Sequence, residues 1–287
     1  MKALIIGFGS AGNTHLQAYK AAGVEVSAIA DTAAGPLDII RPEDGIQKVG
    51  PDWRRILPDV DIVSICSPDE YHFLQVTECL RAGKHVIVEK PPCTRPDELK
   101  FLMKWTAEHP EQNFACSLPL PWNFTELAAK IPDLGKIYLI EVEYNYGRKS
   151  KLMNGWRANP NYSMVLGGGL HMLDLVFWLH PERPADGAAF GCSTTVARVD
   201  TIQAIMRFPS GAIGRLGVNG GYEGRHYHRV AVFGEKADGL IVETTGEVDK
   251  TLPVKAFAEA VKVGTKIDNT RLWDAMKVCF EIESQVS

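Results

Sequence analysis

The N-terminal stretch that decides the fold reads KALIIGFGSAG over residues 2–12. A short apolar run leads into three glycines with the spacing Gly7-x-Gly9-x-x-Gly12, and a helical pattern over 10–22 follows. A strand, a glycine-rich turn and a helix in this order are the context in which such a motif binds a dinucleotide. Gly7 permits the tight turn, Gly9 lets the backbone approach a pyrophosphate, and Gly12 lets the helix pack closely on the strand.

An acidic residue at the end of the second predicted strand supports this interpretation. Asp31 lies 19 residues beyond Gly12, where a carboxylate accepts hydrogen bonds from the ribose hydroxyls of the adenosine. The same carboxylate would repel a 2′-phosphate, and the following residues 32–34 supply no arginine or lysine. The pattern predicts NAD rather than NADP, with Phe8 and Ala11 of the glycine loop as further contacts.

The first part of the chain alternates between strand and helix patterns. Strand-like runs lie at 2–6, 24–30, 61–66, 85–88 and 113–116, and helical spacing lies at 10–22, 70–82 and 95–108. Over residues 1–118 this alternation predicts a parallel sheet covered on both faces. The segment 32–59 is rich in glycine and proline, so we expect loops and at most short helices there.

Beyond residue 118 the pattern changes. A long strand is predicted over 136–146, an apolar helix over 169–179, several strands between 186 and 243, and a closing helix over 270–285. Consecutive strands separated by turns indicate a mostly antiparallel sheet. We therefore expect an α/β protein with a second domain over 119–287.

Composition narrows the function. The 287 residues are 45% hydrophobic and 23% charged, with a net charge of −4, which gives no basic surface for nucleic acid or an anionic membrane. The six cysteines form no C-x-x-C pair, so we predict reduced thiols and no metal site. No apolar stretch approaches a membrane span, and the first residues do not resemble a signal peptide, so we expect a cytoplasmic protein.

Three motifs resemble those of a known family. They are GFGSAGNTH at 7–15, DIVSICSPDEYH at 61–72 and AGKHVIVEKP at 82–91, followed more loosely by Trp156-Arg157 and GGGLHMLD at 167–174. In this order they resemble the glucose–fructose oxidoreductase / inositol dehydrogenase (Gfo/Idh/MocA) family. The resemblance implies a Rossmann domain over residues 1–118 and a second domain over 119–287 whose open sheet binds the substrate and supports oligomerisation. It also implies homodimers or homotetramers.

The resemblance also implies roles for the Glu-Lys-Pro motif. Lys90 would point at the substrate hydroxyl and the nicotinamide, where an ammonium stabilises a developing alkoxide. Pro91 would fix the turn that presents Lys90. Glu89 would orient Lys90 or contact the cofactor, and a purely structural ion pair fits it equally well. Ser67 and Pro68 would line the nicotinamide ribose.

Further candidates come from the two helices. His72 is a candidate cofactor contact, although a histidine in a first helical turn more often faces solvent. His171 is the proposed acid/base, since imidazole exchanges a proton near neutral pH. Asp174 lies three residues on, on the same helical face, and is a catalytic candidate that would bond the imidazole or the substrate. Sugar dehydrogenases of the family commonly carry an aspartate four residues before this histidine, where this chain has Gly167.

The substrate candidates are Trp156, Arg157 and His171, while His226 and His228 are interpreted as surface or interface residues. The sequence predicts an NAD(P)-dependent oxidoreductase acting on a CH–OH group of a sugar, polyol or sugar derivative. Three alternatives stay open: an imine or enone reductase, a non-catalytic or regulatory NAD-binding homologue, and a methyltransferase with a similar glycine loop. The Glu89-Lys90-Pro91 motif argues against the last.

Overall fold

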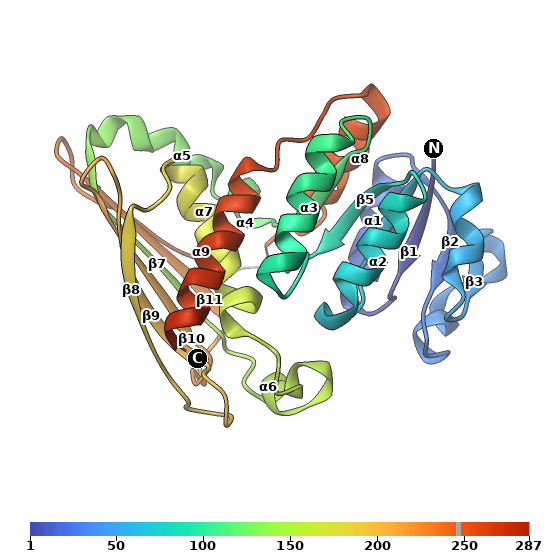
Figure 1. The fold of residues 1–287 in the computed structure, drawn as a ribbon, viewed down its shortest axis with the longest axis horizontal. Helices are drawn as coiled ribbons and strands as arrows, with labels where there is room; N and C mark the ends of the chain where they lie inside the picture. The colour runs from blue at the N-terminus through green and yellow to red at the C-terminus, as the bar shows by residue number, and fades with distance from the viewer. Residues whose placement is uncertain (245–247, 287) are drawn as a thin grey trace. The chain divides into compact units, whose positions relative to one another are not determined.

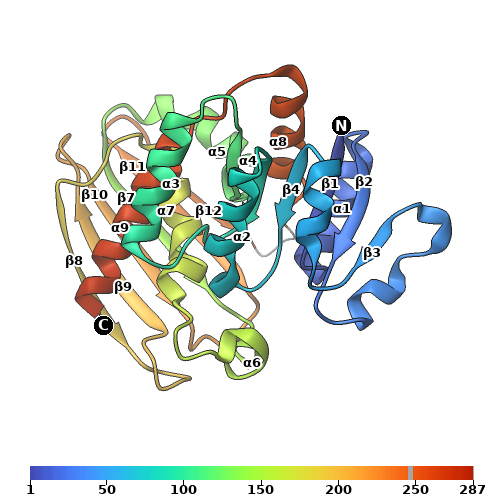
Figure 2. The ribbon, with the colours of Figure 1, turned by 45° about the vertical axis from the view of Figure 1, so that its right-hand side comes forward.

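The computed structural model describes residues 1–244 and 248–286. The chain forms two compact units, and each is described by itself. The first contains Met1–Pro119 and Asp249–Asn269, and the second contains Leu120–Val248 and Thr270–Ser287. Figures 1 and 2 show the ribbon.

The first unit is built on a six-stranded parallel sheet in the order β3-β2-β1-β4-β5-β6. This is the strand order of a dinucleotide-binding Rossmann sheet. Its strands are β1 (Lys2–Ile6), β2 (Glu25–Ala30), β3 (Gln47–Val49), β4 (Ile62–Ile65), β5 (His85–Glu89) and β6 (Phe114–Ser117). Its helices are α1 (Ser10–Ala21), α2 (Asp69–Arg81), α3 (Pro96–Glu108) and α8 (Leu252–Val263), with short 3₁₀ turns η1 (Gly35–Ile39), η2 (Pro42–Asp44) and η3 (Trp53–Asp59).

Buried β-branched and aliphatic residues explain the sheet. Ile62–Ile65 is buried throughout, as is Val86–Val88 of β5, which is typical of parallel strands covered on both faces. The segment 32–59 contains the expected short helical turns, together with the three-residue edge strand β3, which the sequence pattern did not predict.

Helix α8 differs from our expectation for the second domain. We placed residues 119–287 together, but Asp249–Asn269 belongs to the first unit. Val254, Phe257 and Ala258 of α8 are fully buried in the core that α1 and β1 also line. The apolar face of α8 therefore packs on a sheet formed more than 100 residues earlier in the chain.

The second unit carries a six-stranded sheet in the order β12-β11-β7-β10-β9-β8. All neighbours are antiparallel except β7 and β10, which are parallel. The strands are β7 (Ile137–Asn145), β8 (Asp186–Cys192), β9 (Thr201–Arg207), β10 (Ile213–Asn219), β11 (Tyr227–Gly234) and β12 (Leu240–Thr244). The helices are α4 (Leu120–Asn123), α5 (Thr125–Lys130), η4 (Ile131–Leu134), α6 (Ser150–Met153), η5 (Gly155–Ala158), the π-helical turn η6 (Val165–Gly169), α7 (Leu170–Leu179) and α9 (Thr270–Val286).

Helices α7 and α9 cover one face of this sheet, as Figures 1 and 2 show. Helix α7 is apolar nearly all round because α9 and the strands bury it on several sides. The other face carries charged pairs, including Arg215 with Glu141 and Glu143 at 2.9 and 2.8 Å, and exposed apolar residues such as Phe190 and Ile205.

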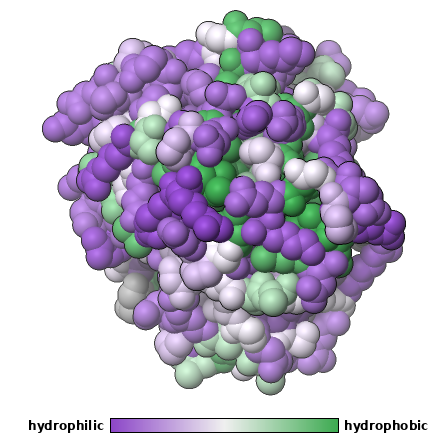
Figure 3. All heavy atoms as spheres, turned by 90° about the vertical axis from the view of Figure 1, so that its right-hand side faces the viewer, coloured by the Kyte–Doolittle hydropathy of each residue, from purple (hydrophilic) through white to green (hydrophobic). Residues whose placement is uncertain are grey.

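Among the described residues, no helix has the length and apolarity needed to cross a membrane. The face drawn in Figure 3 is mostly hydrophilic, with apolar side chains gathered near its centre.

Candidate cofactor and proton-transfer sites

The glycine loop has the stereochemistry that a dinucleotide site requires. Gly7 adopts φ +87°, a left-handed conformation that favours glycine. A Cβ at Gly7 would also lie 2.6 Å from the backbone nitrogen of Ser67, and one at Gly12 would overlap the carbonyl oxygen of Gly7. At Gly9, by contrast, a Cβ would meet nothing within 4 Å. The space beside Gly9, at the N-terminus of α1, fits a pyrophosphate, and no side chain caps this helix end.

Asp31 lies directly after β2 and is bonded to the glycine loop. Its Oδ2 accepts a hydrogen bond from the backbone N–H of Phe8 at 2.7 Å, and its Oδ1 accepts one from Ala33 at 2.9 Å. A carboxylate fixed in this way at the carboxyl end of β2 fits the hydroxyls of an adenosine ribose.

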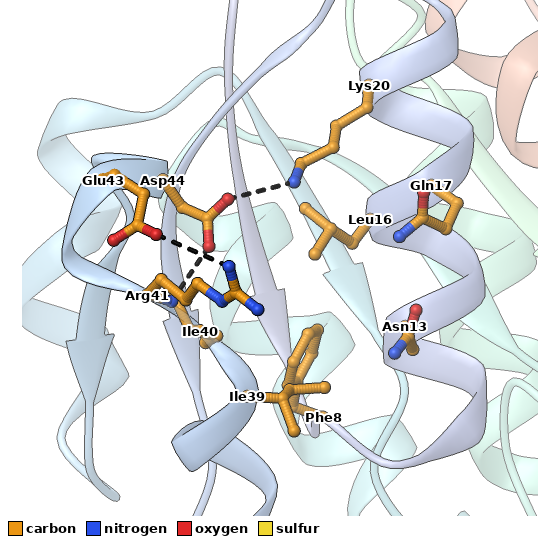
Figure 4. Close-up of a pocket in the computed structure, with 10 residues that line it drawn as sticks. All are labelled: Phe8, Asn13, Leu16, Gln17, Lys20, Ile39, Ile40, Arg41, Glu43 and Asp44. Carbon is orange, nitrogen blue, oxygen red and sulfur yellow. Dashed lines mark hydrogen bonds and ion pairs between the residues drawn. The ribbon is translucent and has the colours of Figure 1, made fainter.

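A cavity of about 310 Å³ adjoins the glycine loop on the side of α1 (Figure 4). Two ion pairs, Lys20–Asp44 at 3.3 Å and Arg41–Glu43 at 3.7 Å, lie at its wall. Its cations are thus matched by carboxylates, so the cavity offers no excess positive charge for a 2′-phosphate. It is lined by Phe8, Asn13, Leu16, Gln17, Lys20, Ile39, Ile40, Arg41, Glu43 and Asp44.

The Glu-Lys-Pro motif follows β5 at the same edge of the sheet. Lys90 is partly buried, and the Lys90–Pro91 peptide is cis. The Oε1 of Glu89 lies 3.2 Å from Nε2 of the fully buried His15. Burial opposes ionisation of Glu89, but the hydrogen bond and charge of His15, the charge of Lys90 and a hydrogen bond with Ser117 lower its pKa to about 2. Glu89 is therefore a carboxylate at neutral pH.

A chain of buried polar groups continues from His15. Its Nδ1 lies 2.9 Å from Oγ of Ser64, which in turn lies 2.7 Å from the hydroxyl of Tyr19. Burial raises the pKa of Tyr19, so the phenol stays protonated. Sequence reasoning missed this network. Its only signals were a serine within the apolar strand β4 and a histidine at position i of an i, i+4 pair with Tyr19 on α1.

His72 is fully buried, rather than facing solvent. Its Nδ1 lies 2.7 Å from the carbonyl oxygen of Pro91, and its Nε2 lies 2.7 Å from that of Ser67. Both ring nitrogens are used within the protein, which leaves neither for the cofactor. The Ser67 hydroxyl donates to Gln75 at 2.6 Å, and Pro68 precedes the first turn of α2.

In the second unit, His171 lies in the first turn of α7 and stacks on Tyr144 of β7, with ring centroids 6.2 Å apart and planes at 17°. The rings of His226 and His228 also contact the Tyr144 ring, with centroids 5.1 and 5.2 Å away. His228 is buried, so it belongs to an aromatic cluster around Tyr144 rather than to an open surface.

The carboxylate of Asp174 is hydrogen-bonded to Arg271. Its Oδ1 accepts a hydrogen bond from Nε of Arg271 in α9 at 2.7 Å, so the pair ties α7 to α9. Burial raises the pKa of Asp174, and the Arg271 charge opposes that shift. Oδ1 is thus taken by Arg271, whereas we expected Asp174 to bond the His171 imidazole or the substrate.

Two of the three glycines before α7 make room for tyrosines. A Cβ at Gly167 would overlap the hydroxyl of Tyr162, and one at Gly168 would lie 2.7 Å from the Tyr144 ring. Both lie in the π-helical turn η6, a feature that is frequent at functional sites. A side chain at Gly167 would therefore collide with the Tyr162 hydroxyl.

The side chains of Trp156 and Arg157 contact each other, and Trp156 also contacts Tyr162. The Arg157 guanidinium lies 4.0 Å from the centre of the Trp156 ring, which meets Tyr162 edge-on at 5.5 Å. Arg198 donates to the backbone carbonyls of Leu152 and Arg157 and so anchors the loop.

Among the residues that the structure describes, no group of three or more histidines, cysteines or carboxylates has the arrangement of a metal site.

The parallel sheet, its glycine loop and Asp31 define a dinucleotide-binding Rossmann protein. The chain belongs to the Gfo/Idh/MocA oxidoreductase family. Residues 1–115 match its model "Oxidoreductase family, NAD-binding Rossmann fold", and residues 132–238 match the "GFO/IDH/MocA C-terminal domain". This confirms the family and the fold class that the sequence predicted.

Curated relatives are similar at low identity. Myo-inositol 2-dehydrogenase of Thermotoga maritima is 24% identical over 82% of this chain and 73% of its own length. D-glucoside 3-dehydrogenase of Escherichia coli is 27% identical over 62% of this chain and 54% of its own. An uncharacterized oxidoreductase of Bacillus subtilis, YrbE, is 31% identical, but the match spans 37% of this chain and 32% of that protein. Two of these three matches thus cover only about a third and about a half of the relative's own length.

Solved structures share the fold. Myo-inositol 2-dehydrogenase from Lactobacillus plantarum has a TM-score of 0.86 at 18% identity, over 99% of this chain and 96% of that one. Scyllo-inositol dehydrogenase from Lactobacillus casei, solved with bound NAD(H) and scyllo-inositol, has a TM-score of 0.83 at 18% identity, over 100% and 96% of the two chains.

Proposed function

We propose that this protein is an NAD-dependent oxidoreductase that transfers a hydride between the nicotinamide and a hydroxyl or carbonyl carbon of a sugar, polyol or sugar derivative. The main support for this proposal is the set of groups at the carboxyl edge of the parallel sheet in the first unit. There the open Gly9, the tethered Asp31 and Lys90 each follow a different strand. Open α/β sheets bind ligands at this edge.

Each residue has a role in this proposal. The glycine loop holds the pyrophosphate, and Asp31 holds the adenosine ribose. Lys90 stabilises negative charge on the substrate oxygen, and His171 exchanges the hydroxyl proton. The bound nicotinamide supplies the hydride chemistry. Trp156 and Arg157 contact the substrate, which the names of the relatives suggest is a polyhydroxylated ring.

The test begins with fluorescence titration of NADH and NADPH, followed by a panel of sugars, inositols and sugar acids monitored at the nicotinamide absorbance. We expect tighter binding of NADH, turnover with at least one polyol, and loss of turnover in Lys90→Met. Lys104→Met is the matched control, because Lys104 is 73% exposed on α3. Failure of both cofactors to bind would exclude the proposal.

A non-catalytic NAD-binding role is the second candidate, and Gly167 favours it. The family resemblance places an aspartate at this position, where the Tyr162 hydroxyl leaves no room for a Cβ. This candidate predicts NADH binding without turnover across the panel, and no effect of Lys90→Met in cells. An imine or enone reductase would oxidise NADH with those substrates only.

We also propose that the helix-free face of the second unit's sheet binds a second copy of this chain. Phe190 is 77% exposed and Ile205 is 57% exposed on this face, and such apolar groups are typical of an interface when they cluster. Light scattering should show a dimer or tetramer that Ile205→Lys dissociates. A monomeric wild-type protein would contradict this.

A further inference from the structure

Two fully buried histidines hold the residues on either side of Lys90. His15 comes from α1 and contacts the Glu89 carboxylate, and His72 comes from α2 and contacts the Pro91 carbonyl. All of these groups lie within the first unit. The lysine motif is therefore attached to two of the helices that begin at the carboxyl edge of the sheet, α1 and α2.

The ring of His72 spans two turns of the backbone. It lies 2.7 Å from the carbonyl of Pro91 after β5 and 2.7 Å from the carbonyl of Ser67 after β4. A carbonyl oxygen only accepts hydrogen bonds, so an imidazole N–H is the donor here. Because β4 and β5 are neighbours in the sheet, this ring fixes one turn against the other.

The opposite side of the motif is held through Glu89. Its carboxylate meets His15 at 3.2 Å, and His15 is held in turn by Ser64 at 2.9 Å. Ser64 lies in β4 and is fully buried. Through His15, Glu89 is therefore linked to the buried centre of the sheet.

Lysine has a flexible four-carbon stem, so its ammonium is placed only as well as its backbone is fixed. We propose that His72 is a positioning residue for Lys90, which it aligns by joining the turn after β5 to the turn after β4, while His15 holds Glu89 from the other side. The inference rests on the proposed function, in which Lys90 contacts the substrate oxygen.

The kinetic test compares His72→Gln and His72→Leu with the wild type. Glutamine keeps a donor for one carbonyl, whereas leucine keeps none. We expect kcat to fall in the order wild type, Gln, Leu, by up to about 100-fold, because a misplacement near 1 Å can cost that much. KM for the substrate and the affinity for NADH should change little. His109→Gln is the control, since His109 lies partly exposed at the end of α3.

A second measurement does not depend on turnover. Hydrogen exchange read by mass spectrometry should speed up in His72→Gln within the peptides covering 66–72 and 88–93, and nowhere else. If the wild type has no turnover, the proposed function fails, and this readout still decides the role of His72.

Two outcomes would overturn the inference: a His72→Leu enzyme that folds and keeps wild-type kcat, or exchange unchanged at both turns. A fall in Tm with unchanged kcat of the folded enzyme would assign His72 to stability alone and would also overturn it.

Discussion

The carboxylate of Asp31 accepts a hydrogen bond from the backbone N–H of Phe8 across 2.7 Å. This bond ties the end of β2 to the glycine loop after β1, so the two parts that would hold a ribose and a pyrophosphate are fixed relative to each other. A single carboxylate therefore shapes the loop and offers its remaining lone pairs to a ligand.

Replacing Asp31 by alanine should weaken NADH binding by about 10- to 100-fold, since hydrogen bonds to a charged group contribute about 1.5 to 3 kcal/mol. NADPH binding should fall less or improve, because the negative charge facing a 2′-phosphate is removed. Fluorescence titration with both cofactors measures the ratio. Asp38→Ala is the control, as Asp38 is exposed on η1. An equal loss for both cofactors would contradict the assigned role.

Alanine substitutions in the glycine loop should affect stability at Gly12 and cofactor binding at Gly9. A Cβ at Gly12 would overlap the Gly7 carbonyl oxygen, which is backbone and cannot move aside. Gly12→Ala should therefore lose about 1 to 3 kcal/mol of stability. A Cβ at Gly9 meets nothing within 4 Å, and Gly9 has φ −77°, so Gly9→Ala should keep its Tm but lose NADH affinity. Thermal unfolding and NADH titration of both variants test this, and a lower Tm in Gly9→Ala would count against it.

Local motifs explain why much of the first unit was predictable. The spacing of Gly7, Gly9 and Gly12 indicates a particular backbone conformation, and the alternation of strands and helices predicts a parallel sheet. Helix α8 was missed because nothing near Val254 or Phe257 in sequence shows that its apolar face packs in a core formed by the start of the chain.

The site was predictable by residue type but less so by orientation. The sequence singled out His72, but not that both its ring nitrogens meet carbonyls from two other turns. Asp174 was expected to face His171, yet its carboxylate bonds Arg271, which is 97 residues away in sequence. Such partners are chosen by tertiary packing, which no local pattern records.

The acid stability of the protein should depend on Glu89. Its pKa is lowered from 4.5 to about 2 in the folded protein, so its contribution is present above about 4.5 and is lost as the pH falls toward 2. Glu89→Gln should therefore cost about 2 to 3 kcal/mol at neutral pH and flatten the fall in stability across that window. Urea unfolding at several pH values measures this. A variant whose profile runs parallel to that of the wild type would show that Glu89 does not carry the effect.

The glycine turn before α7 should control His171 through Tyr144. A Cβ at Gly168 would lie 2.7 Å from the Tyr144 ring, so Gly168→Ala should displace the ring that stacks on His171 and lower kcat. At Gly169 the nearest atom would lie 3.5 Å away, an ordinary contact, so Gly169→Ala should leave kcat unchanged and serves as the matched control.

Tyr144→Phe, which keeps the ring, should retain most activity, whereas Tyr144→Leu should resemble Gly168→Ala. The pH–rate profiles of the four variants test this relationship, because a displaced imidazole changes the titration of the reaction while a purely structural effect changes only the amount of folded enzyme. Equal activity in Gly168→Ala and Gly169→Ala would mean that the stack on Tyr144 does not place His171.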